Sequence, residues 1–325
     1  MKPYIGICLL CYCLFLLLPL PTLPKSVGPS DEPSAAPDTP QETQPKPSDA
    51  VFKVLDADAG VIYTFAERDF LIYTVASEMP ASYPTEALKA QAVATYTYYT
   101  YEKARQAENT AALQGADFSA VPSTFPETYS PEGLKKYWGD NYDTHLQTIA
   151  AAVDAVYGKQ ILYDGSPIFA AYHSANAGKT ESSAIVWGNE FAYLQPVVSS
   201  GDTLSPHYKT TVVVSDSDFA AAFPELSLSG DAGAWITDAP AVTDSGTVTS
   251  ITIGGTSYTG KQVREALGLR SACFSVTHGT DGFTFTVSGY GHGVGMSQHG
   301  AKAMAEQGFT YDEILRHYYT GVTIE

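Results

Sequence analysis

The sequence predicts an α+β fold: a single mixed domain with an alanine-rich buried helix and antiparallel strands, behind an N-terminal apolar segment. Three observations support this prediction. Residues 84–108 show helical periodicity, with small residues on the faces that would be buried. Later segments contain several short runs rich in β-branched and aromatic residues, which are typical of strands. No internal repeat is visible along the 325 residues.

The chain begins with an apolar segment followed by a polar linker. Residues 4–18 carry no charge, and the apolar run extends to Leu23. A membrane span needs about 20 apolar residues, so we expect residues 1–23 to be a signal peptide or signal anchor. The absence of a clean A-x-A cleavage site favours the anchor. Residues 24–50 are rich in Pro, Ser, Asp and Glu, which predicts a disordered tether. Residues 51–325 would then form an extracytoplasmic domain, membrane-anchored, or secreted if the signal is cleaved.

Charge and cysteine content exclude two classes of protein. Cys8, Cys11 and Cys13 lie inside the apolar run, so only Cys273 remains in the folded part and no internal disulfide is expected there. Cys13 lacks the preceding small residues expected of a lipoprotein cysteine. The formal net charge of −17 argues against nucleic-acid binding, which needs a basic face.

The first half of the folded part predicts a change from extended to helical structure. β-branched and aromatic residues open it, in residues 61–65 and 69–80. The pattern changes at Pro84, a residue suited to the first helical position, and a long buried helix follows over residues 84–108. Residues 109–145 contain many Ser, Pro, Gly and Tyr, and we expect an irregular excursion there.

The second half predicts strands interrupted by short helices. We expect a helix over residues 145–158, stopped by Gly158, and a hairpin over residues 159–178 with Asp164-Gly165 as its turn. Further strands are expected at 208–215, 247–255, 273–279 and 283–289, with a short helix at 260–269.

The C-terminal end carries a clear helix signal. Thr310 and Glu313 are spaced as a capping box, and the helix that follows would be closed by Gly321. A further helix is expected just before it, over residues 301–307.

Three segments together carry a family resemblance: ASEMPASYPTEALKAQAVA (76–94), AAYHSANAGKTESSAIVWG (170–188) and the segment from Gly289 to Ile324. They resemble the SpoIID/LytB family, the group of stage II sporulation protein D and the amidase enhancers. The motifs EALKAQAVA, GHGVGMSQHGA and ILRHYYTGV are each specific, and GKQVREALGLRSACFSV also fits. The resemblance extends from about residue 60 to the end and implies a SpoIID-type domain.

The resemblance implies an activity, because the family includes peptidoglycan lytic transglycosylases. Such an enzyme protonates the bridging oxygen of a glycosidic bond, and the sugar's own 6-hydroxyl closes on the anomeric carbon. One carboxylic acid can serve first as acid and then as base. No second carboxylate is needed, unlike in glycoside hydrolysis. The expected role is sporulation, engulfment or wall remodelling, without a cofactor.

Glu78 is the candidate catalytic acid. It follows an apolar run and precedes Met79-Pro80, which interrupts regular structure, and the resemblance places it at the family's catalytic glutamate. An ordinary helix-end carboxylate is the alternative. Glu86 and Glu181 are rival acids, although Glu86 is better explained as a first-turn helix residue.

The glycines of GYGHGVGMSQHGA, residues 289–301, alternate with other residues. Glycine permits close approach of the backbone to another surface. We therefore expect Gly291 and Gly293 to expose backbone against which a sugar ring could lie. A tight structural turn packed on the alanine-rich helix is the alternative.

Polar residues near these glycines are candidate substrate-binding groups. His292 would project between the glycines, and Ser297 and Gln298 stand before a helix whose N-terminal amides can hold oxygen atoms. His173 and Ser174 are expected to line the same cleft. A buried structural role is the alternative for His292.

A zinc site is a weaker reading of the histidines. His173, His292 and His299 could meet, but structural zinc favours Cys and His at short spacings, and the segment HSANAGKTES contains no cysteine. No metal is therefore predicted. Ser–His hydrolysis is discounted, because neither Ser174 nor Ser297 sits in a nucleophile elbow.

One residue departs from the family pattern. Relatives usually carry arginine eighteen residues beyond the catalytic glutamate, where this chain has Tyr96. Tyrosine cannot supply a charge for a substrate carboxylate. Tyr96 is still placed among the substrate-binding residues, and Lys89 or Arg105 are candidates for a compensating cation.

Two functional readings follow. The first is a membrane-tethered lytic transglycosylase that cleaves peptidoglycan glycan strands, denuded of their stem peptides by an amidase. The second is a non-catalytic glycan-binding activator of an N-acetylmuramoyl-L-alanine amidase. Both imply glycan strands, a cell-wall amidase and other membrane proteins of an engulfment complex as partners, with membrane attachment through the N-terminal anchor.

Overall fold

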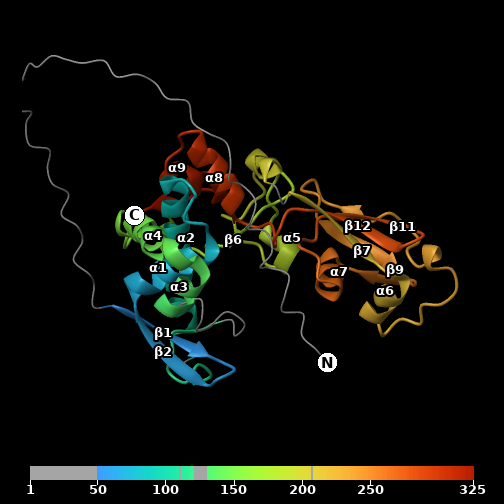
Figure 1. The fold of residues 1–325 in the computed structure, drawn as a ribbon, viewed down its shortest axis with the longest axis horizontal. Coiled ribbons are helices and arrows are strands. Elements are labelled where there is room, and N and C mark those ends of the chain that lie inside the picture. The colour runs from blue at the N-terminus through green and yellow to red at the C-terminus, as the bar shows by residue number, and fades with distance from the viewer. Residues whose placement is uncertain (1–49, 110, 121–129, 206–207) are drawn as a thin grey trace, which may run out of the picture. The chain divides into compact units, whose positions relative to one another are not determined.

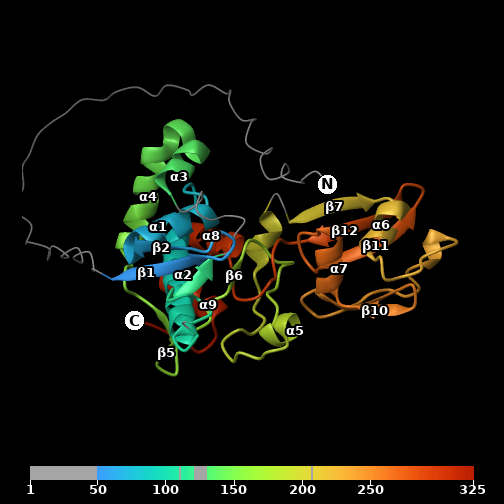
Figure 2. The same ribbon diagram turned by 90° about the horizontal axis from the view of Figure 1, so that it is seen from below.

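The computed structural model describes residues 50–109, 111–120, 130–205 and 208–325. The predicted signal segment 1–23 and tether 24–50 lie outside these residues, except for Ala50. Within the described part, no helix is both long and apolar enough to span a bilayer. The described residues form a mixed structure of helices and mainly antiparallel strands, as the sequence predicts (Figures 1 and 2).

A small sheet opens the fold. Strands β1 (Val51–Asp56) and β2 (Val61–Ala66) pair antiparallel, and β3 (Phe118–Ala120) joins β1 in parallel, giving the order β2-β1-β3. The sheet packs through an aromatic cluster whose buried members are Phe52, Val54, Phe70 and Phe118.

The segment from residue 69 onward, which we grouped with the extended opening of the domain, is helical. Helix α1 spans Glu67–Glu78. Its Phe70, Leu71, Thr74 and Val75 are all buried, at the i, i+1, i+4, i+5 spacing of one helical face. Packing of this face against its neighbours outweighs the strand preference of its β-branched residues.

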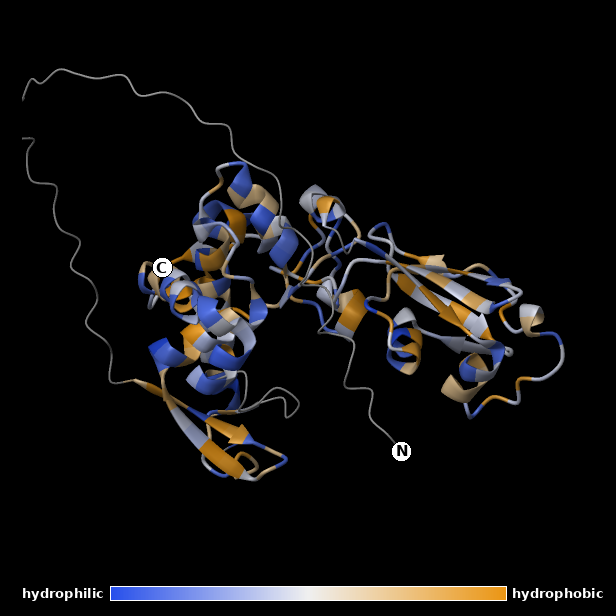
Figure 3. Ribbon diagram, in the orientation of Figure 1, coloured by the Kyte–Doolittle hydropathy of each residue, from blue (hydrophilic) through white to orange (hydrophobic). Residues whose placement is uncertain are grey.

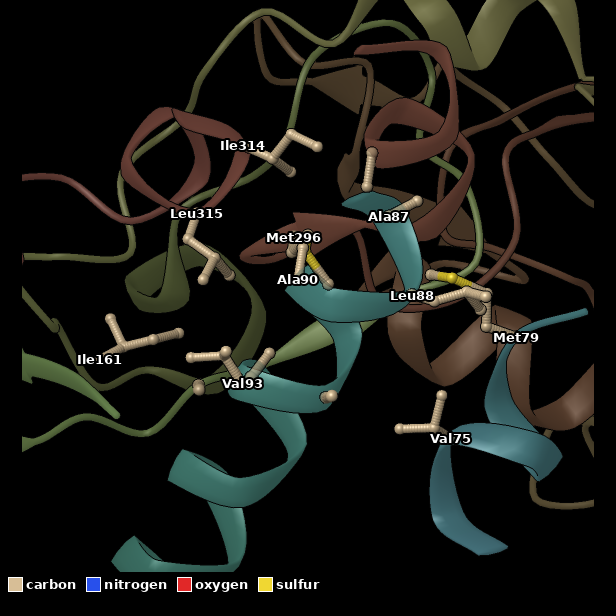
Figure 4. Packing of buried hydrophobic residues seen from close by; sticks show 14 of the residues in the cluster. Val75, Met79, Ala87, Leu88, Ala90, Val93, Ile161, Met296, Ile314 and Leu315 are labelled. Atoms are coloured by element: carbon tan, nitrogen blue, oxygen red, sulfur yellow. The ribbon is translucent and has the colours of Figure 1, made fainter. Parts of the chain in front are cut away.

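The long buried helix is confirmed. Helix α2 spans Thr85–Gln106, and Ala87, Ala90 and Ala94 are fully buried in it. Their small side chains allow α1, α4, α8 and α9 to approach α2 closely. Figure 4 shows Leu88 and Val93 of α2 in the largest hydrophobic cluster, together with Val75 and Met79.

The expected irregular excursion over residues 109–145 is only partly irregular. It contains β3 and helix α3 (Pro131–Trp138), which Ser130 caps by accepting a hydrogen bond from the Gly133 N–H at 3.1 Å. A short 3₁₀ turn (Gly139–Asn141) then leads into α4 (Tyr142–Asp154). The predicted helix at 145–158 is therefore confirmed, with an earlier start.

The predicted hairpin turn is also confirmed. Strands β4 (Ile161–Tyr163) and β5 (Ser166–Pro167) are joined by Asp164 and Gly165, both with positive φ, and β14 (Thr323–Ile324) pairs antiparallel with β4. Beyond the hairpin come β6 (Tyr172–His173), helix α5 (Ser183–Trp187) and a 3₁₀ turn η4 (Ser200–Leu204).

Residues 208–288 hold the predicted strands. Their larger sheet has the antiparallel order β11-β12-β7, from β11 (Phe274–Gly279), β12 (Gly282–Ser288) and β7 (Lys209–Val214). A second sheet contains β8 (Ala241–Val242), β9 (Val248–Ile253) and β10 (Thr256–Tyr258). Helices α6 (Asp216–Ala222) and α7 (Gly260–Leu267) and a 3₁₀ turn (Ala232–Ala234) complete this part. Figure 3 shows hydrophobic residues interleaved with polar ones along its strands.

Two helices close the fold. Helix α8 (Gln298–Glu306) follows β13 (Met296–Ser297), which pairs in parallel with β6. It begins three residues before the predicted start because the Ser297 hydroxyl caps it. Helix α9 (Tyr311–Tyr318) has the predicted capping box between Thr310 and Glu313.

Candidate active site

Glu78 is the last residue of α1, at a reversal of the chain. The next residue, Met79, is buried in the core beside Leu88 and Val75, and residues 80–84 lead directly into α2 (Figure 4). Burial of Met79 anchors the end of the helix, while Glu78 itself remains exposed to solvent. The carboxyl group is thus held on a rigid element and is accessible to a ligand.

Gln298 is the side chain that contacts this carboxyl group. Its Nε2 lies 3.3 Å from Oε2 of Glu78 and 3.4 Å from Oε1 of Gln91. Gln91 in turn donates to Thr95 at 3.1 Å. Gln298 is the first residue of α8, so a chain of neutral amides links α8 and α2 to Glu78.

The surroundings of Glu78 favour its protonated form. Burial by the surrounding protein raises the pKa of Glu78, and the hydrogen bond from Gln298 lowers it only in part. The carboxyl group is open to solvent on one side, yet protein surrounds most of it, so the direction of the shift follows from its position. A glutamic acid that keeps its proton at higher pH is suited to general acid catalysis.

A cleft of about 600 Å³ contains Glu78. Its lining includes Tyr172, Trp187 and His292, and also Glu102 and Arg105 of α2. The remaining lining is largely aromatic or apolar: Val54, Phe70, Tyr98, Tyr99, Leu113, Phe118, Phe169 and Ala171, with Gln106 and Ser119. Aromatic faces with few polar groups suit a sugar chain, which presents both apolar ring faces and hydroxyl groups.

The alternating glycines serve close packing of the backbone. Gly289, Gly291, Gly293 and Gly295 all have positive φ. A Cβ at Gly289 would lie 2.8 Å from the Ala175 oxygen, one at Gly291 would lie 2.9 Å from Cβ of His173, and one at Gly295 would collide with the Ala171 oxygen. These positions support the alternative of a tight structural turn. Only at Gly293 is the nearest atom as far as 3.8 Å.

His292 lies in the cleft wall, with its ring 5.1 Å from that of Trp187 and 5.6 Å from that of His173. Its Nδ1 accepts from the Val294 N–H at 3.1 Å, and the ring also bonds to the Tyr172 backbone. Burial lowers the pKa of His292 to about 4. The ring is therefore neutral at pH 7 and offers a surface for stacking.

His173 is fully enclosed behind His292. Its Nδ1 lies 3.0 Å from the Val294 oxygen, and Nε2 lies 3.4 Å from the Asn176 amide nitrogen. Burial lowers the pKa of His173 to about 3. Both ring nitrogens are thus engaged, so His173 supports the cleft wall from behind.

Ser297 and Ser174 belong to a buried network centred on Asp202, a residue that no sequence pattern indicates. Asp202 has no exposed surface, and it accepts from Ser297 Oγ at 2.5 Å and from the Asn176 backbone N–H at 3.1 Å. It also bonds to Ser199, which contacts the Tyr318 hydroxyl at 2.7 Å. Ser174 takes part through its backbone oxygen, which lies 3.4 Å from Ser297 Oγ and 3.0 Å from His299 Nδ1. A single Asp in SGDTLSP gives no sequence signal of such burial.

Tyr96 is not brought together with Glu78. Its hydroxyl donates to Glu67 at 3.3 Å, at the opposite end of α1. Burial raises the pKa of Tyr96 to about 12, so the phenol stays protonated. Of the two candidate cations, Arg105 lines the cleft, whereas Lys89 pairs with Glu86 at 2.8 Å.

The other acids and histidines are placed elsewhere. The Glu86 carboxylate accepts from the Tyr311 N–H at 2.8 Å, and Glu181 is buried against Thr243 at 2.6 Å. His299 Nε2 lies 3.2 Å from the Tyr83 hydroxyl. Among the described residues, no group of three or more His, Cys, Asp or Glu could hold a metal ion.

Comparisons with known proteins agree with the motifs that form this site. Residues 56–163 match the family model described as Stage II sporulation protein. Stage II sporulation protein D of Bacillus subtilis (strain 168) is 37% identical over 259 residues, which are 79% of this chain and 74% of that protein. The protein of the same name from Bacillus amyloliquefaciens is 38% identical over 259 residues, 79% of this chain and 73% of that protein.

A more distant relative is the amidase enhancer of Bacillus subtilis (strain 168). It is 28% identical over 304 residues, which cover 77% of this chain and 39% of the enhancer. The resemblance drawn from the motifs is thereby confirmed. Because stage II sporulation protein D of Bacillus subtilis is 37% identical and is matched over 74% of its length, the chain belongs to the SpoIID family of stage II sporulation proteins.

Proposed function

We propose that this protein is a peptidoglycan lytic transglycosylase that uses Glu78 as general acid and then as general base. The observation that carries the proposal is the position of Glu78: a carboxyl group with a raised pKa, on a rigid helix end, in an aromatic cleft. Its side-chain partner among the described residues, Gln298, is a neutral amide that bonds to a single carboxyl oxygen.

The cleft favours a lyase-type reaction over hydrolysis. Hydrolases place two carboxyl groups within about 5–9.5 Å of each other. The other carboxylate in the described cleft lining is Glu102, which is paired with Arg105 at 2.6 Å. It lies eleven residues beyond Gln91 on α2, about 16 Å of helical rise. Glu78 would therefore act without a second acid.

The Glu78 carboxyl group alone can supply and take back the proton that the reaction needs. Glu78 gives its proton to the glycosidic oxygen while the bond between that oxygen and the anomeric carbon of a muramoyl residue breaks. The 6-hydroxyl oxygen of the same residue bonds to the anomeric carbon, and its proton returns to Glu78. No water is consumed, and the product carries a 1,6-anhydromuramoyl end.

The relatives support a wall-remodelling role. Two relatives covered over about three quarters of their length are named for sporulation, and the amidase enhancer is named for its effect on an amidase. We infer that the chain works on the extracytoplasmic side of a membrane, held by residues 1–23, on strands that a cell-wall amidase has stripped of peptide.

A second function has its own support. The relation to the amidase enhancer, and a tyrosine at position 96 where the resemblance implies arginine, favour a protein that holds glycan for an amidase without cutting it. The aromatic cleft would serve this function equally well, and Glu78 would then be a binding group.

The Glu78→Gln variant separates the two functions. The amide keeps the size of the side chain but cannot transfer a proton, so formation of anhydro ends should fall by about 10² to 10⁴-fold. Mass spectrometry of digested denuded glycan measures this. Glu86→Gln is the control, since Glu86 bonds to Lys89 and Tyr311 outside the cleft lining. A wild-type protein that forms no anhydro ends but stimulates an amidase would establish the second function instead.

A further inference from the structure

We propose that Arg105 is a specificity residue that binds the free lactyl carboxylate of a muramoyl residue, several sugars away from the bond at Glu78. The inference rests on the proposed glycan substrate and deepens it. In a glycan strand each muramoyl residue carries a lactyl group, whose carboxyl is either linked to a peptide as an amide or free as an anion. A cation in the cleft can distinguish these two states.

Arg105 is the single Lys or Arg among the described residues that line the cleft. About half of its side-chain surface, 52%, is exposed. The cleft also holds His292, but the lowered pKa of that ring leaves it neutral. Within the described lining, a ligand anion therefore finds its one positive partner at Arg105.

Glu102 holds the guanidinium in a fixed orientation. Nε of Arg105 donates to Glu102 Oε1 at 3.1 Å, and Nη2 donates to Oε2 at 2.6 Å. This pair uses the side edge of the guanidinium, through Nε and one N–H of Nη2. Nη1 and the second N–H of Nη2 form the other edge, a fork that matches a carboxylate in two parallel hydrogen bonds. No acceptor from the described residues occupies this fork.

Arg105 lies far from the Glu78 carboxyl group along the cleft. Gln91, which shares the Gln298 amide with Glu78, lies fourteen residues before Arg105 on α2, about 21 Å of helical rise. Between them, the lining residues Tyr98 and Phe169 have rings 5.5 Å apart. Arg105 therefore acts on a remote part of the substrate, where binding energy selects the strand without touching the reacting atoms.

This role would also compensate for Tyr96, which stands where the resemblance implies an arginine. Tyr96 is buried against Glu67 and supplies no charge to the cleft. Arg105, nine residues further along the same helix, carries the charge at another point of the cleft. The chain would thus keep a preference for strands that an amidase has already processed.

Binding measurements on the inactive full-length chain test the inference without requiring turnover. Glu78→Gln and Glu78→Gln/Arg105→Gln are titrated with three ligands: a long denuded strand, the same strand with its carboxyls converted to methyl amides, and a denuded tetrasaccharide. Arg105→Gln should weaken binding of the long denuded strand by about tenfold or more, as expected for hydrogen bonds between charged groups. Binding of the amidated strand and of the tetrasaccharide should be unchanged.

Lys103→Gln is the matched control. It removes one positive charge from the same helix, but Lys103 faces Asp117 and the Val51 oxygen and does not line the cleft. It should leave the preference for the denuded strand intact. Equal weakening of denuded and amidated strands by Arg105→Gln, or no weakening at all, overturns the inference alone. Failure of Glu78→Gln to bind any strand overturns both this inference and the proposed function.

Discussion

Two regions of the molecule, each with its own hydrophobic core, differ in the polar side chains that they bury. The cleft region comprises residues 50–205 and 289–325 of the described chain, and the β-rich region comprises residues 208–288. In the described residues, every buried His, Asp, Glu, Asn and Gln lies in the cleft region. The buried polar residues of the β-rich region are Ser245, Thr247 and Ser271.

The core of the β-rich region consists mainly of large aromatic and aliphatic side chains, without such a buried polar network. Phe219, Phe223, Phe283 and Phe285 are all fully buried, and the rings of Phe219 and Phe283 stack 4.0 Å apart. Such a core is stabilised mainly by apolar burial. It contributes none of the residues that line the cleft.

The cleft region carries the candidate site, whereas the β-rich region contributes to the stability of the fold. Buried hydrogen bonds around Asp202 and His173 fix the geometry of the cleft walls at a cost in desolvation. The aromatic core of the β-rich region carries no such cost and no site residue. Substitutions in the β-rich core should therefore lower the free energy of unfolding without changing glycan binding. Substitutions in the cleft region should change the pH dependence of stability or glycan binding. Three predictions test this difference.

The largest effect is expected from Phe285→Ala. The ring lies on β12 between β11 and β7, contacts Phe274 and is fully buried, so its removal leaves a cavity. We expect a loss of about 3–5 kcal/mol in the free energy of unfolding, measured by chemical denaturation. Glycan binding by the folded fraction should be unchanged.

Val213→Ala on the same sheet is the control. Val213 is 55% exposed, and its truncation should change the unfolding free energy by less than about 0.5 kcal/mol. If Phe285→Ala abolished glycan binding in protein that is still folded, the two regions would be coupled and the comparison would be broken.

The sequence predicted the elements whose signals are local. The long helix α2, the turn at Asp164-Gly165 and the capping box of α9 follow from helical periodicity, turn chemistry and cap spacing. Helix α1 was missed because its β-branched residues favour strands, and only packing against α2 and α4 decides the outcome.

The candidate site was predictable only in part, for a similar reason. The motifs indicate Glu78, Gln298 and His292; the structure brings Gln298 into contact with Glu78 and places His292 in the lining of the same cleft. The role of Asp202 depends on contacts with residues 95 positions later in the chain, and no local pattern reveals such contacts. For Tyr96 the motif indicates a substrate-binding residue, but the motif does not show where the side chain points, and the hydroxyl bonds to Glu67.

A smaller effect is expected from the buried imidazole of His173. The lowered pKa means that the folded state keeps the ring neutral while the unfolded chain takes up a proton below about pH 6.5. The stabilisation is therefore complete above pH 6.5 and is lost as pH falls towards 3. The loss should be about 1.4 kcal/mol per pH unit, or roughly 2 kcal/mol between pH 6.5 and 5.

Comparison of wild type with His173→Gln isolates this contribution. Denaturation curves at pH 7, 6 and 5 should show a shallower loss of stability in the variant. Glu78 and Asp202 titrate in both proteins and cancel from the difference, whereas His292, whose ring lies 5.6 Å from that of His173 and whose charge adds to the His173 shift, is counted with it. Equal slopes would show that His173 is not the acid-sensitive group of the cleft region.

The smallest expected effect, from Tyr96→Phe, decides between the motif and the structure. The phenol donates one hydrogen bond to Glu67, which is also 4.0 Å from Lys103, so its loss should lower the free energy of unfolding by about 1 kcal/mol. Glycan binding should not change, because the hydroxyl lies at the far end of α1 from Glu78.

Tyr98→Phe provides the contrast, since the Tyr98 side chain lines the cleft and should affect binding more than stability. Weaker glycan binding by Tyr96→Phe at unchanged stability would return Tyr96 to the substrate-binding residues predicted from the sequence, and would extend the cleft beyond the lining described above.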